Sequence, residues 1–163
     1  MNIKQKYFVA SFRGDKIKPE DFNFKKIDGT EYYIDELGNQ WKEERIWDNG
    51  WGNEYGFIKL PEPTFEELWK LLFESNKFNN YRGASEILNN KYPSELKNKL
   101  QNLFDKSKKL SCKQIKRIRL LELGTNRNEV IGVNKETVEK DYNEWKKLKS
   151  DFERLSKKKF WLF

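Results

Sequence analysis

The sequence offers few side chains that could carry acid–base or nucleophilic chemistry. It contains no histidine, which removes the commonest general base and every histidine-dependent triad. The single cysteine, Cys112, could act as a nucleophile only if a cation such as Lys113 or Lys116 stabilised its thiolate. One cysteine without histidine also excludes an internal disulfide and a cysteine- or histidine-rich zinc site. We interpret Cys112 as a structural thiol.

Two pairs of neighbouring carboxylates are the remaining candidates for acid–base catalysis or for a magnesium site. They are Asp35–Glu36 and Glu43–Glu44. Glu43 and Glu44 are adjacent in a predicted strand, so their side chains should point to opposite faces of the sheet. Solvated surface charge is the better interpretation of both pairs.

Glycines 50, 52 and 56 are spaced somewhat like those of a dinucleotide-binding loop. The third glycine is one residue too late for that motif, and no strongly helical segment follows it. A phosphate-binding loop of the Walker type is also absent from the sequence. We therefore expect no enzyme: no catalytic, cofactor-binding or metal-binding residues, and no cofactor.

Aromatic residues around the glycine-rich segment 47–56 form the first candidate binding site. They are Trp41, Trp47, Trp51, Tyr55 and Phe57. Trp and Tyr on loops are favoured contact residues in protein interfaces. The alternative is that these rings fold inward and form the core of a small sheet. We predict Trp47, Trp51 and Tyr55 as partner-binding residues.

A basic segment without any acidic residue forms the second candidate site. Between residues 106 and 121 it carries Lys106, Lys108, Lys109, Lys113, Lys116, Arg117 and Arg119. Because no carboxylate lies among them to neutralise them, these cations favour contact with phosphate or with an acidic protein surface. The alternative is a solvated helix face. We predict Lys113, Lys116, Arg117 and Arg119 as partner-binding residues.

The net charge is concentrated in the last third of the chain. Residues 1–63 carry 10 basic and 12 acidic side chains, residues 64–105 carry 6 of each, and residues 106–163 carry 17 and 8. The last segment thus has a net charge of +9, more than the whole chain's +7. Such asymmetry indicates an anionic partner, unless it only reflects a generally lysine-rich surface.

The elements that must position these residues belong to a folded chain. Its mean hydropathy is −1.00, which by itself would suggest disorder. However, 15% of its residues are aromatic, and large rings supply much buried area per residue. A length of 163 residues fits one domain, 1–163. Without an apolar run of signal-peptide or membrane-spanning length, we expect a cytoplasmic protein with no membrane contact.

The first part of the chain, 1–63, is predicted to be β-rich and slightly acidic. Residues 7–12 form a short β-prone run. Residues 31–35 and 40–47 predict a hairpin whose turn contains Gly38. The glycine-rich aromatic segment 47–56 is expected to be a loop, and 57–60 another short strand.

From residue 64 to the end the pattern becomes helical, and from residue 106 basic. Thr64 with Glu67, and Ser111 with Gln114, have the spacing of capping boxes that open helices. Further helices are predicted over 82–91, over 94–106 with Ser94 as its cap, and over 135–156. Gly124 is expected to end the helix that Ser111 opens. Strands followed by helices predict an α+β fold, with an antiparallel sheet of three to four strands and four to five packed helices.

The segment 132–145, GVNKETVEKDYNEW, resembles the recognition helix of bacterial helix-turn-helix regulators. By this resemblance, Asn134, Lys135, Thr137 and Lys140 would take the positions that face DNA. Only seven residues separate Gly124 from Gly132, which leaves room for at most one turn of helix before this segment. The resemblance implies a nucleic-acid-binding protein that uses its basic C-terminal third.

The stretch 35–104 resembles small bacterial immunity proteins, which neutralise secreted toxins. The residues that carry this resemblance are Asp35-x-x-Gly38-x-x-Trp41, the Trp47-to-Gly56 segment, Pro61-x-Pro63-Thr64 opening a helix, Arg82-Gly83-Ala84, and Tyr92-Pro93. It implies a cytosolic inhibitor that binds one toxin and performs no chemistry. The basic character of the chain would suit a toxin with an acidic binding face.

The leading hypothesis is therefore a non-enzymatic protein-binding module, an immunity protein that neutralises a bacterial toxin by direct binding. The alternative hypothesis is a nucleic-acid-binding protein.

Overall fold

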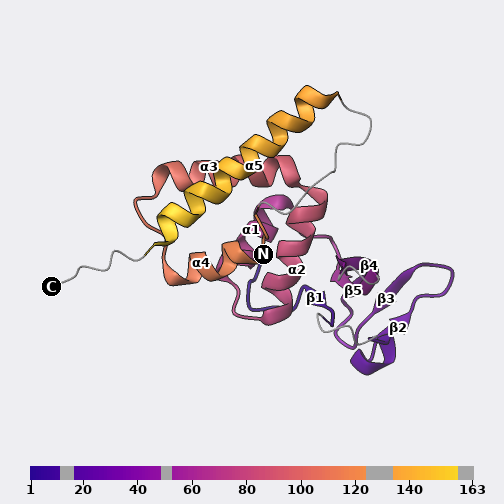
Figure 1. Cartoon of the computed structure of the whole chain (residues 1–163). Coiled ribbons are helices and arrows are strands. Elements are labelled where there is room, and N and C mark those ends of the chain that lie inside the picture. Colours follow the sequence, from indigo (N-terminus) through magenta and orange to yellow (C-terminus); the bar gives the residue numbers. More distant parts are fainter. Residues whose placement is uncertain (12–16, 49–52, 124–133, 158–163) are drawn as a thin grey trace. The chain divides into compact units, whose positions relative to one another are not determined.

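The structure is a computed structural model of the chain, and it describes residues 1–11, 17–48, 53–123 and 134–157 (Figure 1). For residues 47, 48, 53 and 54 the description covers the backbone alone. The chain divides into two compact units, residues 1–91 and residues 92–163. Among the described residues, the first unit contains the sheet, a short 3₁₀ helix and two α-helices, and the second contains three α-helices.

The first unit is built on a five-stranded antiparallel sheet, in the order β1-β5-β4-β3-β2. Its strands are β1 (Phe8–Val9), β2 (Lys25–Lys26), β3 (Tyr32–Ile34), β4 (Gln40–Asp48) and β5 (Asn53–Lys59), and a short 3₁₀ helix, η1 (Pro19–Phe22), precedes β2. The α+β fold is thus confirmed. The sheet has one strand more than the expected maximum of four. This strand is β2, whose two lysines lack the β-branched or aromatic side chains that mark strands in a sequence.

The expected loop over residues 47–56 is wrong at both ends, because residues 47–48 belong to β4 and residues 53–56 belong to β5. Gly56 pairs with Glu44 of β4 inside the sheet. A Cβ atom at position 56 would lie 2.5 Å from the Cδ1 of Ile46 and 2.6 Å from the carbonyl oxygen of Val9. This glycine therefore permits a close approach within a strand and does not mark a loop.

One face of the sheet carries an aromatic cluster. It consists of Val9, Phe24, Trp41 and Phe57, with Ile17, Phe22 and Tyr33 packed against it. The pairings Val9↔Phe57 and Tyr33↔Trp41 place these side chains on the same face, because residues directly opposite each other share a face. Phe8, paired with Ile58, lies on the opposite face.

That opposite face contacts helix α2 (Phe78–Lys91), which packs against β1 and β4 and also against α1 (Phe65–Glu74). The capping box predicted for α1 is confirmed, since the Thr64 hydroxyl accepts from the Glu67 amide and the Glu67 carboxylate accepts from the Thr64 amide. Helix α2 starts four residues earlier than predicted, at Phe78. Its Gly83 lies against the buried ring of Phe8.

The second unit consists of α3 (Pro93–Lys106), α4 (Cys112–Arg119) and α5 (Lys135–Ser156). Helices α3 and α5 pack side by side (Figure 1). The unit has buried side chains on α3, α4 and α5 and on the segments beside α4. These are Leu96, Leu100, Phe104, Leu110, Ile118, Leu121, Trp145, Leu148 and Leu155.

The helix boundaries of the second unit are mostly as predicted. The capping box of Ser111 with Gln114 and the range of α5 are confirmed. The cap assigned to α3 is wrong: Tyr92 occupies the N-cap and Pro93 the first helical turn, where its missing N–H has no cost. Helix α4 ends at Arg119, before Gly124, which lies outside the described residues.

Candidate binding surfaces

The aromatic residues predicted to bind a partner do not share one environment. Trp41 and Phe57 are 2% and 1% exposed, and Phe24 lies between them with ring centroids at 5.0 and 5.2 Å. For these two residues the alternative interpretation, a ring folded into the core, is correct. Tyr55 is 53% exposed. The backbone of Trp47 belongs to β4, but its side chain, like the whole of Trp51, lies outside the described residues.

Trp41 is held in the core by the turn that precedes it. Its Nε1 donates to Asp35 Oδ2 at 3.0 Å, and the same carboxylate accepts from the amides of Leu37 and Asn39 at 3.0 and 2.8 Å. Gly38 completes this turn with a φ of +79°, which favours glycine. The pattern Asp35-x-x-Gly38-x-x-Trp41 therefore builds a turn and a core contact.

The same hydrogen bonds lower the pKa of Asp35. Burial raises the pKa of this carboxyl, but the bonds from Asn39, Trp41 and Leu37 outweigh burial and lower the pKa below its ordinary value. The charged form of Asp35 is thus the form that the turn requires.

Among the described residues, β1 and β3 pair with only part of β5 and of β4, and the rest of β4 and β5 pair with each other. β3 pairs with residues 40–42 of β4, and β1 pairs with residues 57–58 of β5. In the remaining two-stranded part, Arg45 lies directly opposite Tyr55, and both side chains are exposed. Ile46, next to Arg45, is fully buried. We call Arg45 and Tyr55 the ribbon pair.

The sequence did not single out Arg45. Its position opposite Tyr55 follows only from the strand register.

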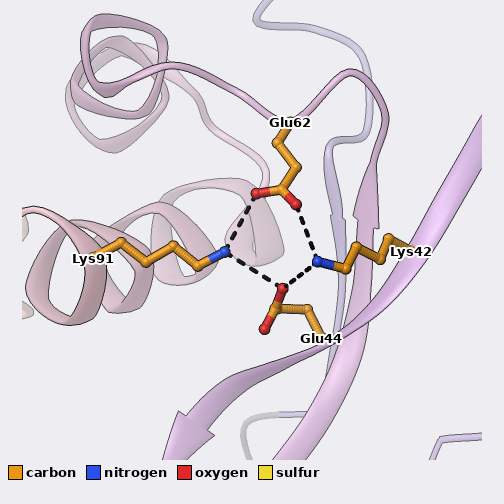
Figure 2. A network of polar contacts seen from close by, with 4 residues as sticks. All are labelled: Lys42, Glu44, Glu62 and Lys91. Carbon is orange, nitrogen blue, oxygen red and sulfur yellow. Dashed lines mark hydrogen bonds and ion pairs between the residues drawn. The ribbon is translucent and has the colours of Figure 1, made fainter.

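The carboxylates considered for catalysis are engaged structurally or exposed. Glu44 belongs to a closed ring of four alternating charges with Lys42, Glu62 and Lys91 (Figure 2). Its Oε2 lies 3.0 Å from Lys42 Nζ and 3.4 Å from Lys91 Nζ. Burial raises the pKa of Glu44, but the two lysines outweigh burial and hold the pKa below its ordinary value. The ring joins β4 to the end of α2 and to the segment after β5. Glu43 is exposed and lies on the other face.

The basic segment forms an exposed surface in the second unit, which we call the cationic surface. It comprises Lys106, Lys108, Lys109, Lys113, Lys116 and Arg119, all exposed, and the half-buried Arg117. On α4, positions 113, 116 and 119 follow one another in steps of three, so they line the side of the helix away from the buried Ile118. Within the described residues no ion pair involves Lys106, Lys108, Lys109, Lys116 or Arg119.

The amino-terminal end of α4 contributes little to this surface through its backbone. The Ser111 amide donates to Gln114 Oε1 at 2.8 Å, and the Gln114 amide donates to Ser111 Oγ at 3.2 Å. The capping box thus occupies two amides that would otherwise be available to an anion. Cys112 is exposed in the first turn of α4. The positive potential here comes from side chains.

Three of the four residues that the resemblance places against DNA make contacts within α5 and its cap. Asn134 Oδ1 accepts from the amide and the hydroxyl of Thr137 at 2.9 and 2.8 Å, and Lys135 pairs with Glu139 at 3.5 Å. Lys140 is exposed. Residues 120–134 separate α4 from α5, whereas a helix-turn-helix joins its helices by three or four residues. Helix α4 therefore cannot be the first helix of such a motif, and residues 124–133 lie outside the described part.

Helix α5 differs from α4 because its charges are mixed. Lys97 of α3 bonds both Asp141, at 2.7 Å, and Glu144 of α5. Burial lowers the pKa of Lys97, but these two carboxylates outweigh burial and raise it above its ordinary value. The unbalanced positive charge of the second unit thus lies mainly on the cationic surface.

Comparison of this chain with protein families, with curated proteins and with solved structures finds no match. In the parts of the chain that the structure describes, no cluster of three or more His, Cys, Asp and Glu side chains is arranged to hold a metal ion. Among the described helices, none has the length and apolar character needed to cross a membrane.

Proposed function

We propose that this chain is a non-enzymatic protein-binding module, and more specifically a cytoplasmic immunity protein that neutralises a bacterial toxin by binding it directly. The observation that carries this proposal is the ribbon pair, in which an exposed tyrosine and an exposed arginine lie opposite each other on two paired strands. The resemblance of residues 35–104 to immunity proteins agrees with it.

The ribbon pair suits a protein interface for two physical reasons. Tyrosine and arginine, with tryptophan, are the residue types that dominate measured binding energies in protein interfaces. Their backbone is fixed by the β4–β5 pairing and by the buried Ile46, so little ordering of the backbone remains to oppose binding. Of the other two predicted contact residues, Trp47 belongs to β4, and Trp51 lies between β4 and β5 in the sequence.

A growth-rescue experiment tests this proposal. We expect a secreted-toxin gene next to the gene of this chain; the chain is co-expressed with that toxin, and binding of the two purified proteins is measured by calorimetry. We expect rescue by the natural chain, and a loss of about 2 kcal/mol or more of binding energy for Tyr55→Ala combined with Arg45→Ala, as for interface hot spots.

Tyr142→Ala is the matched control, since Tyr142 on α5 is 56% exposed, close to the value for Tyr55. This variant should bind and rescue normally. An absence of rescue by the natural chain would refute the immunity proposal. If the ribbon-pair variant and Tyr142→Ala lose the same binding energy, the ribbon pair is not part of the interface.

A second candidate function is nucleic-acid binding through the cationic surface. It is favoured by the exposed cations of the segment 106–119, five of which make no ion pair within the described residues. Binding of this kind must weaken steeply with salt, because each neutralised phosphate releases counterions. Submicromolar binding to a mixed-sequence duplex that persists at physiological salt would place this function first.

A further inference from the structure

We propose that the cationic surface is a docking site for an acidic face of a protein partner, with carboxylates that pair with Lys113, Lys116 and Arg119. This inference rests on the proposed protein-binding function and adds the chemistry of the partner. It concerns the second unit, whereas the ribbon pair belongs to the first. The two surfaces can therefore be tested separately.

The charge of the surface defines the kind of partner. Seven cations lie between residues 106 and 119 with no acidic residue among them, and six of their side chains are exposed. Like charges at this density repel one another, and an anionic partner removes that repulsion while adding attraction.

The spacing along α4 defines the geometry. Positions 113, 116 and 119 are three residues apart, which places successive side chains about 4.5 Å apart along the helix axis. Carboxylates three or four residues apart on a partner helix have Cβ atoms about 5–6 Å apart. A row of carboxylates on one face of a helix therefore matches the row of cations on α4.

The arrangement favours carboxylates over the phosphates of a nucleic acid. Phosphate sites commonly use backbone amides at a helix terminus, and the capping box of Ser111 and Gln114 occupies two of these amides in α4. Five of the seven cations are lysines, which lack the fork that makes bidentate contacts with guanine and phosphate. The surface thus provides separate point charges along a helix face.

The test compares two probes of equal formal charge, a short poly-glutamate peptide and a mixed-sequence DNA duplex. Binding of each to the whole chain is measured by fluorescence anisotropy at low and at physiological salt. We expect the peptide to bind more tightly than the duplex at physiological salt. The triple variant Lys113→Glu, Lys116→Glu, Arg119→Glu should weaken peptide binding about tenfold or more, because it replaces three attractions by three repulsions; a tenfold loss is 1.4 kcal/mol.

The control makes the same change of net charge on α5, with Lys146→Glu, Lys147→Glu and Lys149→Glu. These three lysines are also exposed, but they share their helix with several acidic residues. This variant should keep at least most of the peptide affinity. A further variant, Lys113→Gln, Lys116→Gln and Arg119→Gln, removes the charges without adding carboxylates, and it replaces the first if that one fails to fold.

Three outcomes would overturn the inference. These are tighter binding of the duplex than of the peptide, equal losses in the α4 and α5 variants, and no binding of the peptide by the natural chain at low salt. Toxin neutralisation that survives in the α4 variant, but not in the ribbon-pair variant, would refute the acidic docking site and leave the proposed function intact.

Discussion

Asp35 shows how a single side chain joins a turn to the core. Its carboxylate accepts from two backbone amides of its own turn, from the Asn39 side chain and from the indole of Trp41. The buried indole nitrogen would otherwise lack a partner, and an unmet buried donor is costly. The carboxylate therefore stabilises both the turn and the aromatic cluster.

Replacement of Asp35 by alanine should destabilise the protein by about 1–3 kcal/mol, the cost of leaving a buried donor unsatisfied. The free energy of unfolding from urea denaturation at neutral pH measures this effect. Asp28→Ala is the control, because Asp28 is exposed and makes no contact of this kind within the described residues. Equal stability of the two variants would show that the Trp41 contact contributes nothing.

The same carboxylate should make the protein sensitive to acid. The pKa of Asp35 is lowered by folding from an ordinary value of 3.8, so its contribution to stability is complete well above pH 3.8 and is lost as the pH falls through the folded pKa. Asp35→Asn should therefore flatten the decrease in unfolding free energy below about pH 4. A decrease of unchanged slope in this variant would assign the acid sensitivity to other carboxylates.

At the scale of elements, the contact between α2 and the sheet depends on a glycine. A Cβ atom at position 83 would lie 2.5 and 2.6 Å from two ring atoms of Phe8, which is fully buried. Glycine in the middle of a helix costs about 0.5–1 kcal/mol relative to alanine. The close packing of α2 on β1 outweighs this cost. It explains why a glycine stands at position 83 in the Arg82-Gly83-Ala84 pattern.

Gly83→Ala should accordingly destabilise the protein, although alanine is the better helix former. Overpacking of a filled core costs about 1–3 kcal/mol, against a gain of about 0.5–1 kcal/mol in helix propensity. Asn90→Ala, at an exposed position of the same helix, should be nearly neutral. Thermal unfolding of both variants distinguishes the two effects, and a higher melting temperature for Gly83→Ala would contradict the close packing.

At the scale of the whole molecule, charge and core are divided between the two units. Residues 1–91 carry 14 basic and 16 acidic side chains, and residues 92–163 carry 19 and 10. The first unit has its own core, which includes both faces of the sheet and the buried leucines of α1. The polar contacts of α2 through Lys91 also stay inside this unit.

We predict that residues 1–91, expressed alone, fold and unfold cooperatively. The basis is that the sheet, α1 and α2 bury their apolar side chains against one another. Near-ultraviolet circular dichroism followed through a urea transition measures this, since Trp41 and its aromatic neighbours need fixed packing to give a signal. A fragment without such a signal would show that the chain folds only as one domain of 163 residues.

The sequence by itself determined the features that depend on neighbouring residues. The capping boxes at Thr64 and Ser111 and the 22-residue helix α5 follow from contacts within one or two turns, and they are found where the sequence predicts them. The α+β order of strands and helices has the same origin. The acid-free basic segment was also visible, because net charge does not depend on the fold.

The tertiary structure alone decided which aromatic side chains are buried. Trp41 and Tyr55 look alike in the sequence, but Trp41 meets Phe24 and the Asp35 carboxylate, whereas Tyr55 lies opposite Arg45 where β1 no longer pairs with β5. The strand register and the position of Gly56 determine that Trp41 is buried and Tyr55 is exposed. Both arise from contacts between residues far apart in the chain, and a local pattern carries no information about such contacts.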